Sequence, residues 1–318
     1  MATYSSMVNR TNVSPLIPEE YSREIWKSAP EYSAALRMFR HIQLSTAQHR
    51  VPVLSVLPQA YFVSGDTGLK QTTSVEWANK YLNVEEIAAI VPVPEAVLAD
   101  SKYDLWAEIM PLLVEAIGVL IDGAVFFGTN KPASWPNAIE DGAAAASNTY
   151  TRGSVAGQDL AEDVNQLMKL VETDGFDVNG FIAHPAIKSD LRGLRDANKN
   201  LLFIPGLTSG TPATLYGEPI QYLRNSSFDT ARADILAGDM SKAIIGMRQD
   251  ITWKFLDQSV ISDDTGKIIL NLAQQDSVAL RVVLRLAFQV ANPINRLQQV
   301  EANRYPFAVL RPKGFVGP

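Results

Sequence analysis

The tripeptide Asp-Thr-Gly occurs twice in this chain of 318 residues, at 66–68 and at 264–266. Two such loops, one from each half of a molecule, supply the paired carboxylates of an aspartic protease, in which the two acids share one proton. A catalytic aspartate of that type follows a buried strand, so apolar residues should precede it. Here Ser64-Gly65 precedes the first copy and Ser262-Asp263 the second, which is typical of exposed turns. The tripeptides therefore predict the tips of two hairpins, and the protease stays a minor alternative.

The other side chains with chemical potential form no recognisable site. The three histidines, His41, His49 and His184, are far apart and belong to no metal-binding spacing. The chain has no cysteine, which excludes disulfides, thiolate metal sites and a cysteine nucleophile. A Gly-x-Ser-x-Gly elbow is absent, and Gly266-Lys267 lacks the glycine and the Ser or Thr of a phosphate-binding loop. We expect no catalytic residue, no metal and no cofactor.

The composition is that of a folded globular protein with an acidic surface. Hydrophobic residues make up 47% of the chain and charged residues 19%, and the formal net charge is -6. That balance argues against a surface built to neutralise phosphates. The first residues, MATYSSMVNRTNVSPLIPEEYS, are polar and lack the apolar core of a signal peptide. We expect them to form an extended arm and we expect no export.

The first half of the chain predicts a long hairpin followed by a long helix. Strand-like runs flank the turn at 65–68, so residues 50–94 are expected to form one hairpin. The helix is expected over 101–128, with Ser101 and Asp104 as a capping box and Gly128 as its stop. Pro111 should bend it. The polar residues of this apolar helix are spaced seven apart, which predicts a soluble helix with one wet edge and no membrane span: Glu108, Glu115 and Asp122.

The second half predicts a separate α/β region and a returning strand. Residues 129–153 are rich in Pro, Asn, Gly and Ser and are expected to be loop. Asp159 should cap a helix that ends at Gly175, and a strand should follow at 180–184. Residues 278–290 alternate with period two, apolar residues on one face and Arg281, Arg285 and Gln289 on the other, which predicts a long strand. Helices and strands in this irregular order favour the α+β class.

The order of these elements resembles that of a tailed-phage major capsid protein of the HK97-like family. The resemblance covers nearly the whole chain and is carried by five stretches in order: NVEEIAAIVPVPEAVLADS, FIAHPAIKSDLRGLRDANKNLLFIP, LYGEPIQY, AGDMSKAIIGMRQDI and DSVALRVVLRLAFQVANP. It implies an N-terminal arm at 1–49, an E-loop at 50–94, a P-domain spine helix at 95–128, an inserted A-domain at 129–239 and a P-domain return at 240–318.

The resemblance also gives both tripeptides a role in contacts between subunits. It places Gly65, Asp66, Thr67, Gly68 and Lys70 at the E-loop tip. It places Asp263, Asp264, Thr265, Gly266 and Lys267 in the P-domain hairpin. Some members join the two loops by an isopeptide bond between a lysine and an asparagine. Lys70 suits the first role, but Asn271 lies beyond the hairpin, so non-covalent assembly is expected.

The resemblance implies partners as well. Copies of the chain are expected to form pentamers and hexamers of an icosahedral shell around double-stranded phage DNA, without sequence-specific DNA binding and without a membrane. Separate scaffolding, portal and decoration proteins are expected, with assembly in the host cytoplasm and the virion capsid as the final location. An encapsulin, a bacterial shell of the same fold that encloses enzymes, is the alternative, because fold alone does not fix function.

Overall fold

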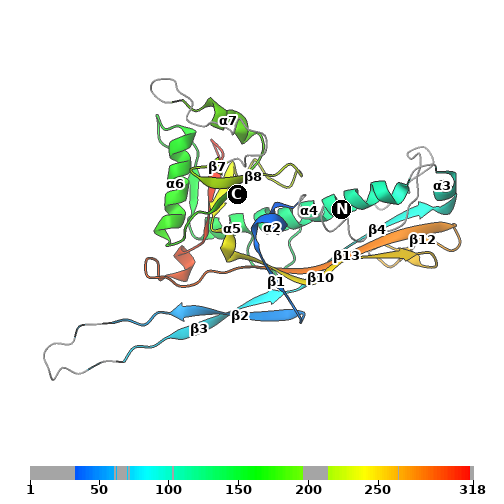
Figure 1. Ribbon diagram of the computed structural model, residues 1–318, viewed down its shortest axis with the longest axis horizontal. Coiled ribbons are helices and arrows are strands. Elements are labelled where there is room, and N and C mark those ends of the chain that lie inside the picture. The colour runs from blue at the N-terminus through cyan, green and yellow to red at the C-terminus, as the bar shows by residue number, and fades with distance from the viewer. Residues whose placement is uncertain are drawn as a thin grey trace.

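Two sheets organise the protein, and a two-stranded hairpin extends from the first of them (Figure 1). The computed structural model describes residues 33–60, 62, 70, 72–101, 104–195, 214–263 and 265–315. We call the part built on the four-stranded sheet the first unit and the part built on the six-stranded sheet the second unit. The mixture of helices with largely antiparallel sheets confirms the predicted α+β class.

The first unit is a long sheet packed against a long helix. Its strands lie in the order β1 (Arg40–Gln43), β10 (Ala243–Leu256), β13 (Ser277–Val290) and β4 (Glu85–Pro94). The alternation predicted for β13 is confirmed, since the residues of one face are buried: Leu280, Val282, Leu284, Leu286, Phe288 and Val290. They share a core with helix α4 (Leu105–Phe127), with the short helix α2 (Ala34–Met38) and with α3 (Glu95–Asp100), which links β4 to α4.

Helix α4 begins and ends at residues that satisfy its free backbone groups. The carboxylate of Asp104 accepts a hydrogen bond from the Trp106 amide at 2.9 Å, and Gly128 ends the helix in the left-handed region with φ 71°. Asp104 is therefore the cap, and the predicted start at Ser101 was wrong. Among the described helices α4 is long and apolar enough to span a membrane, but most of it is buried inside the protein. The predicted wet edge is also wrong at Asp122, which is fully buried.

The long hairpin predicted over 50–94 is divided in the structure. Strands β2 (Gln48–Val56) and β3 (Glu76–Asn83) pair from Gln48 opposite Asn83 to Val56 opposite Glu76. The amide of Val84 then donates to the Ala47 carbonyl, and β4 turns to pair with β13 instead. The reason is that alternate residues of β4 are apolar and pack on the core of the first unit: Ile87, Ala89, Val91 and Val93.

The second unit is a six-stranded sheet with helices packed against it. Its strands lie in the order β5 (Thr149–Thr151), β14 (Phe307–Arg311), β9 (Ile235–Gly238), β6 (Gly180–Ala183), β8 (Glu218–Tyr222) and β7 (Thr214–Leu215). Helix α6 (Leu160–Thr173) begins at Asp159, whose carboxylate accepts from the Glu162 amide, as predicted. Leu160, Val164, Leu167 and Val171 of α6 join one core with α7 (Ile187–Gly193) and the sheet.

Two segments of the second unit differ from prediction. The stretch 129–153 was predicted to be loop, yet it contains α5 (Ile139–Ala145) and β5, because Ile139 and Ala143 are buried in the core. The segment 240–318 was predicted to return wholly to the first unit. Its last strand, β14, instead lies between β5 and β9 in the six-stranded sheet, where all five of its residues are buried. The 3-10 turns η1 (Met240–Lys242) and η2 (Glu301–Asn303) connect the two units.

Gly238 offers a sharp test of this central strand packing. It pairs with Gly180 on one side and with Phe307 on the other, and a Cβ there would come within 3.0 Å of the Pro306 carbonyl and the Phe307 ring. We expect Gly238→Ala to lower the free energy of unfolding by about 2 kcal/mol, since the backbone of β14 must shift. In the control, Gly193→Ala, the added methyl meets nothing within 4 Å, so urea unfolding should show no loss. Equal unfolding curves for the two variants would contradict the packing argument.

Candidate assembly surfaces

The β2–β3 hairpin exposes apolar side chains that its own subunit does not cover. It projects away from both sheets in Figure 1. Trp77 is 66% exposed and Tyr81 is 44% exposed, and Phe62 and Val75 of the same segment are exposed too. An isolated two-stranded ribbon is marginally stable in water, and an exposed tryptophan on it is typical of a surface that another molecule buries. The hairpin is therefore a candidate assembly surface.

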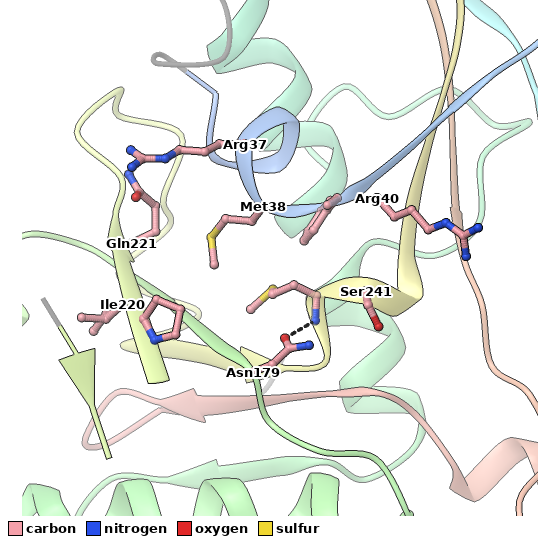
Figure 2. A pocket seen from close by; sticks show the side chains of 10 residues that line it. Arg37, Met38, Arg40, Asn179, Ile220, Gln221 and Ser241 are labelled. Carbon is pink, nitrogen blue, oxygen red and sulfur yellow. Dashed lines mark hydrogen bonds between the residues drawn. The ribbon is translucent and has the colours of Figure 1, made fainter. Parts of the chain in front are cut away.

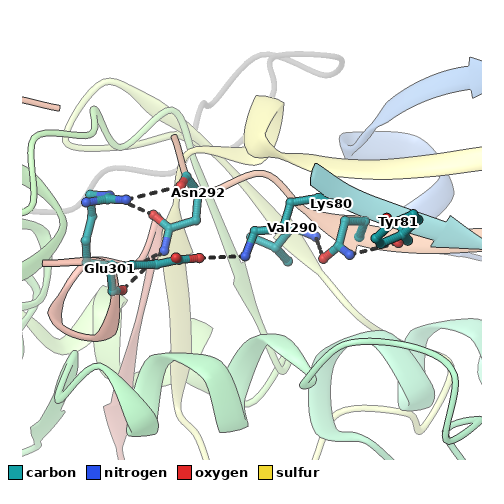
Figure 3. A network of polar contacts seen from close by, with 7 residues as sticks. Lys80, Tyr81, Val290, Asn292 and Glu301 are labelled. Carbon is teal, nitrogen blue, oxygen red and sulfur yellow. Dashed lines mark hydrogen bonds and ion pairs between the residues drawn. The ribbon is translucent and has the colours of Figure 1, made fainter. Parts of the chain in front are cut away.

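The base of this hairpin is fixed to the first unit by polar contacts, several of which Figure 3 shows. Lys80 Nζ lies 2.6 Å from Glu301 Oε1, and the Gln289 side-chain amide donates to the Tyr81 carbonyl at 2.9 Å. Beyond the end of β2, the Arg296 guanidinium donates to the Pro58 carbonyl at 2.8 Å. The Lys80 pair is partly exposed and contributes little stability by itself. Together these contacts set the direction in which the hairpin leaves the subunit.

A second hairpin lies at the other end of the four-stranded sheet. Strands β11 (Val260–Ser262) and β12 (Ile268–Asn271) pair, and the side chains of Val260, Ile268 and Ile269 are exposed. At its tip the Asp263 carboxylate accepts from the Thr265 amide at 3.0 Å, the Thr265 hydroxyl at 2.7 Å and the Lys267 amide at 2.8 Å. Gly266 takes φ 82°. The predicted residues Asp263, Thr265, Gly266 and Lys267 thus form one ordered turn.

The predicted residues of the two hairpin tips are only partly described. Asp264 lies outside the described residues, and so do Gly65, Asp66, Thr67 and Gly68 of the first hairpin. Lys70 is described and exposed. Asn271, at the end of β12, donates its side-chain amide to Gln274 Oε1 at 2.9 Å. Within the described ranges, no group of three His, Cys, Asp or Glu residues is placed to hold a metal ion.

The turn at Asp263 gives a pH prediction. Hydrogen bonds from the Thr265 hydroxyl and then the Lys267 amide hold the pKa of Asp263 below its ordinary value. A carboxyl whose pKa is lowered by folding keeps the turn ordered above its unfolded pKa of about 3.9, and this order is lost as the pH falls through the lowered value. We expect the Thr265 and Lys267 amide resonances to titrate together as the pH falls through the lowered pKa of Asp263, and we expect Asp263→Ala to abolish the titration. Titration unchanged in Asp263→Ala would contradict the assignment.

A buried carboxylate that sequence reasoning missed connects three distant segments. Asp122 of α4 accepts from the Ser33 hydroxyl at 2.7 Å, from the Ala34 and Ala35 amides at 3.0 Å each and from the Asn225 side chain at 2.7 Å. Its bonds to residues 33–35 hold the first turn of α2. Burial raises the pKa of Asp122, and its four hydrogen bonds oppose that shift without overcoming it. The signal in the sequence was an aspartate within the most apolar half of α4.

A second buried network joins α4 to the second unit. The Arg232 guanidinium donates to the Phe127 carbonyl at 2.8 Å, at the end of α4 where cations are favourable, and to Asp141 at 2.6 Å. The Arg311 guanidinium donates to the Arg232 carbonyl at 3.0 Å. Both arginines also form ion pairs with the buried carboxylate of Glu140. This network fixes β14 and α5 against the end of α4, so the two units form one rigid frame.

A groove that could hold a small ligand lies between α2 and the second sheet (Figure 2). It encloses about 570 Å³ and is lined by Arg37, Met38, Phe39, Arg40, Asn179, Pro219, Ile220, Gln221, Met240 and Ser241. The Asn179 side chain accepts from the Met240 amide at 2.8 Å, and the Ser241 hydroxyl donates to Asp239 at 2.6 Å. Among the described residues of this lining there is no histidine and no carboxylate, although the Asp239 carboxylate lies next to it.

A rigid frame that exposes apolar hairpins at opposite ends defines a subunit of a larger assembly. The comparisons agree with this class. The model of the phage capsid family matches residues 14–297. The major capsid protein of Staphylococcus phage 80alpha is 23% identical over 283 residues, which are 86% of this chain and 81% of that protein. The chain belongs to the phage capsid family.

Solved structures support the same assignment. A chain from Microbacterium phage Oxtober96 is 39% identical with a TM-score of 0.79, and the match covers 96% of this chain and 100% of that one. A chain from Mycobacterium phage Cain is 32% identical with a TM-score of 0.79, and the match covers 98% and 100%. The predicted HK97-like fold and the role of major capsid protein, a shell component of the virion, are confirmed. The encapsulin and the aspartic protease are not favoured.

Proposed function

We propose that copies of this chain form pentamers and hexamers that close into an icosahedral shell around double-stranded DNA. The observation that supports this most is the β2–β3 hairpin, whose base packs on the first unit through the buried Leu82 and whose outer part exposes Trp77. In the proposal, each hairpin lies over an adjacent subunit, and the β11–β12 hairpin meets neighbours where capsomers join. Contacts between unlike patches of identical subunits close into rings, as such a shell requires.

The proposed division of the chain follows the resemblance, with the amendments that the strands require. We assign residues 1–47 to an arm, 48–83 to the E-loop, 85–128 with 240–290 to the P-domain, and 129–239 with 307–311 to the A-domain. The proposed contact residues at the E-loop tip are Gly65, Asp66, Thr67, Gly68 and Lys70. Those of the P-domain hairpin are Asp263, Asp264, Thr265, Gly266 and Lys267.

The proposal also names partner proteins, and it excludes sequence-specific DNA binding, enzymatic activity and covalent crosslinks. The formal net charge of -6 suits a shell that neither binds the packed DNA tightly nor recognises its base sequence. We propose assembly in the host cytoplasm with separate scaffolding, portal and decoration proteins, and no enzymatic activity. Asn271 lies in the strand beyond the hairpin tip, which supports non-covalent assembly. A denaturing gel of purified shells should then show a single band near 34.8 kDa.

The test is negative-stain electron microscopy of the purified protein, with mass photometry of the same sample. Closed shells, or rings of five and six subunits, are expected. A species that stays monomeric when concentrated, and also when mixed with a scaffolding protein, would overturn the proposal. Copurifying enzyme in place of DNA would redirect it to the encapsulin.

A further inference from the structure

The outer face of the four-stranded sheet carries two cations that face each other. Arg281 of β13 lies directly opposite Lys254 of β10 on one side and Ile90 of β4 on the other. Residues opposite each other in a sheet point to the same face, and like charges in that arrangement repel. This face is turned away from α4, because the neighbouring residues Leu280 and Val282 point into the core.

Arg281 and Lys254 lack the compensation that a nearby arginine has. Arg285, four residues further along β13 and on the same face, donates from Nε to Glu86 at 2.6 Å. Among the described residues, neither Arg281 nor Lys254 lies within 4.0 Å of a carboxylate, and the buried Nε of Arg281 has no hydrogen-bond partner. An unpaired buried donor is costly, so the pair is suited to an anion that another molecule supplies.

The surroundings of the pair favour a carboxylate on an apolar strand. Ile90, beside Arg281, is 42% exposed. The matching feature of the chain is at the outer end of the β2–β3 hairpin, where Glu76 stands next to the exposed Trp77. Within the described residues, Glu76 forms no ion pair. The exposed Glu76 carboxylate complements the two cations in charge.

Glu76 cannot reach this pair within its own subunit. Strands β3 and β4 run on from one another in Figure 1, and Glu76 is 14 residues before Ile90 along them. At about 3.3 Å per residue, two strands that run on in this way span about 46 Å. A contact between Glu76 and Arg281 is therefore a contact between two copies of the chain.

We propose that the Lys254–Arg281 pair is the docking site for Glu76 of a neighbouring subunit's β2–β3 hairpin. This inference rests on the proposed function, and it names the partner residues of the hairpin. The interaction is electrostatic, so it weakens with salt and sets the register in which hairpin and sheet meet.

Charge reversal tests the docking. Lys254→Glu and Glu76→Lys alone should each raise the concentration needed for shell formation about tenfold, and the double variant should restore it. Arg285→Glu serves as the control and should not be restored by Glu76→Lys, since Arg285 already pairs with Glu86. Lys254 is exposed and Lys254→Glu removes its repulsion with Arg281, so this monomer should unfold at or above the wild-type temperature. If the double variant is not rescued, while assembly of the wild type still requires the hairpin, the docking is overturned and the proposed function stays intact.

A chemical test is available because the chain has no cysteine. Glu76→Cys with Lys254→Cys should give dimers and longer ladders when shells are treated with a short bismaleimide, whereas each single variant should give none. Absence of ladders would overturn the docking. A short double-stranded DNA mixed with the monomer provides the other arm: binding that Lys254→Glu removes would assign the cation pair to phosphates and overturn the proposal.

Discussion

Replacing Asp122 with alanine is expected to lower the free energy of unfolding by about 3 kcal/mol. The change leaves the Ser33 hydroxyl, the Ala34 and Ala35 amides and the Asn225 side chain facing a cavity in place of an acceptor. Each buried donor left unsatisfied costs about 1–3 kcal/mol. Burial already penalises the charged carboxylate, as its raised pKa indicates, and so the net loss is smaller than the sum of four bonds.

The loss should be concentrated at α2, because Asp122 holds the first turn of that helix. Hydrogen exchange should show faster exchange over residues 34–38 in Asp122→Ala, while β13 keeps its protection. Glu115→Ala is the matched control, because Glu115 is a carboxylate on the same helix that is not fully buried; it should change the free energy of unfolding by less than about 0.5 kcal/mol. Equal losses in the two variants would show that Asp122 is not the organising group.

Periodicity and capping residues made much of the fold predictable. The alternation of 278–290 predicted β13, and Asp159 and Gly175 bounded α6, because these signals depend only on local geometry and on a face that must be buried. The division of the hairpin at Val84 was missed. Residues 76–83 and 85–94 are both strand-like, and only their partners, β2 for one and β13 for the other, separate them.

The contact surfaces and the buried polar contacts were harder to predict from the sequence. Asp122 was placed on a wet edge because seven-residue spacing does not reveal which neighbours cover a stripe. Arg281 was recognised as a polar-face residue, but the repulsion from Lys254 depends on the register of two strands that are 27 positions apart in sequence. The α5 helix was hidden by Pro136 before its start and Gly142 within it, although its alanine run favours a helix.

The buried networks explain how a subunit can present a projecting hairpin reliably. The Arg232 and Arg311 network fixes the two units, and the contacts of Lys80, Gln289 and Arg296 fix the base of the hairpin. Docking a preorganised surface costs less conformational entropy than docking a mobile one. In a shell of many copies, this lower entropy cost applies at every contact. The direction of the hairpin therefore matters more for assembly than the stability it adds to the monomer.

Removing the outer part of the hairpin is expected to abolish assembly while the monomer stays folded. Residues 57–75 can be replaced by Asn-Gly, a two-residue turn that suits the pair Val56 and Glu76 at the end of the ribbon. The described residues of this segment are largely exposed, so the free energy of unfolding should change by less than about 1 kcal/mol. Loss of one central contact of about 2 kcal/mol per subunit already raises the required concentration about 30-fold.

The cause of that loss can be separated from a general weakening of the subunit. Trp77→Ala keeps the backbone of the hairpin and removes one large exposed aromatic side chain, so it should assemble worse than wild type and better than the shortened chain. Lys80→Met, which breaks only the partly exposed pair with Glu301, should assemble nearly as well as wild type. Mass photometry and sedimentation of all three variants give the ranking. Normal shells from the shortened chain would show that the hairpin is not the surface that holds subunits together, and the exposed β11–β12 hairpin would then have to carry the contact alone.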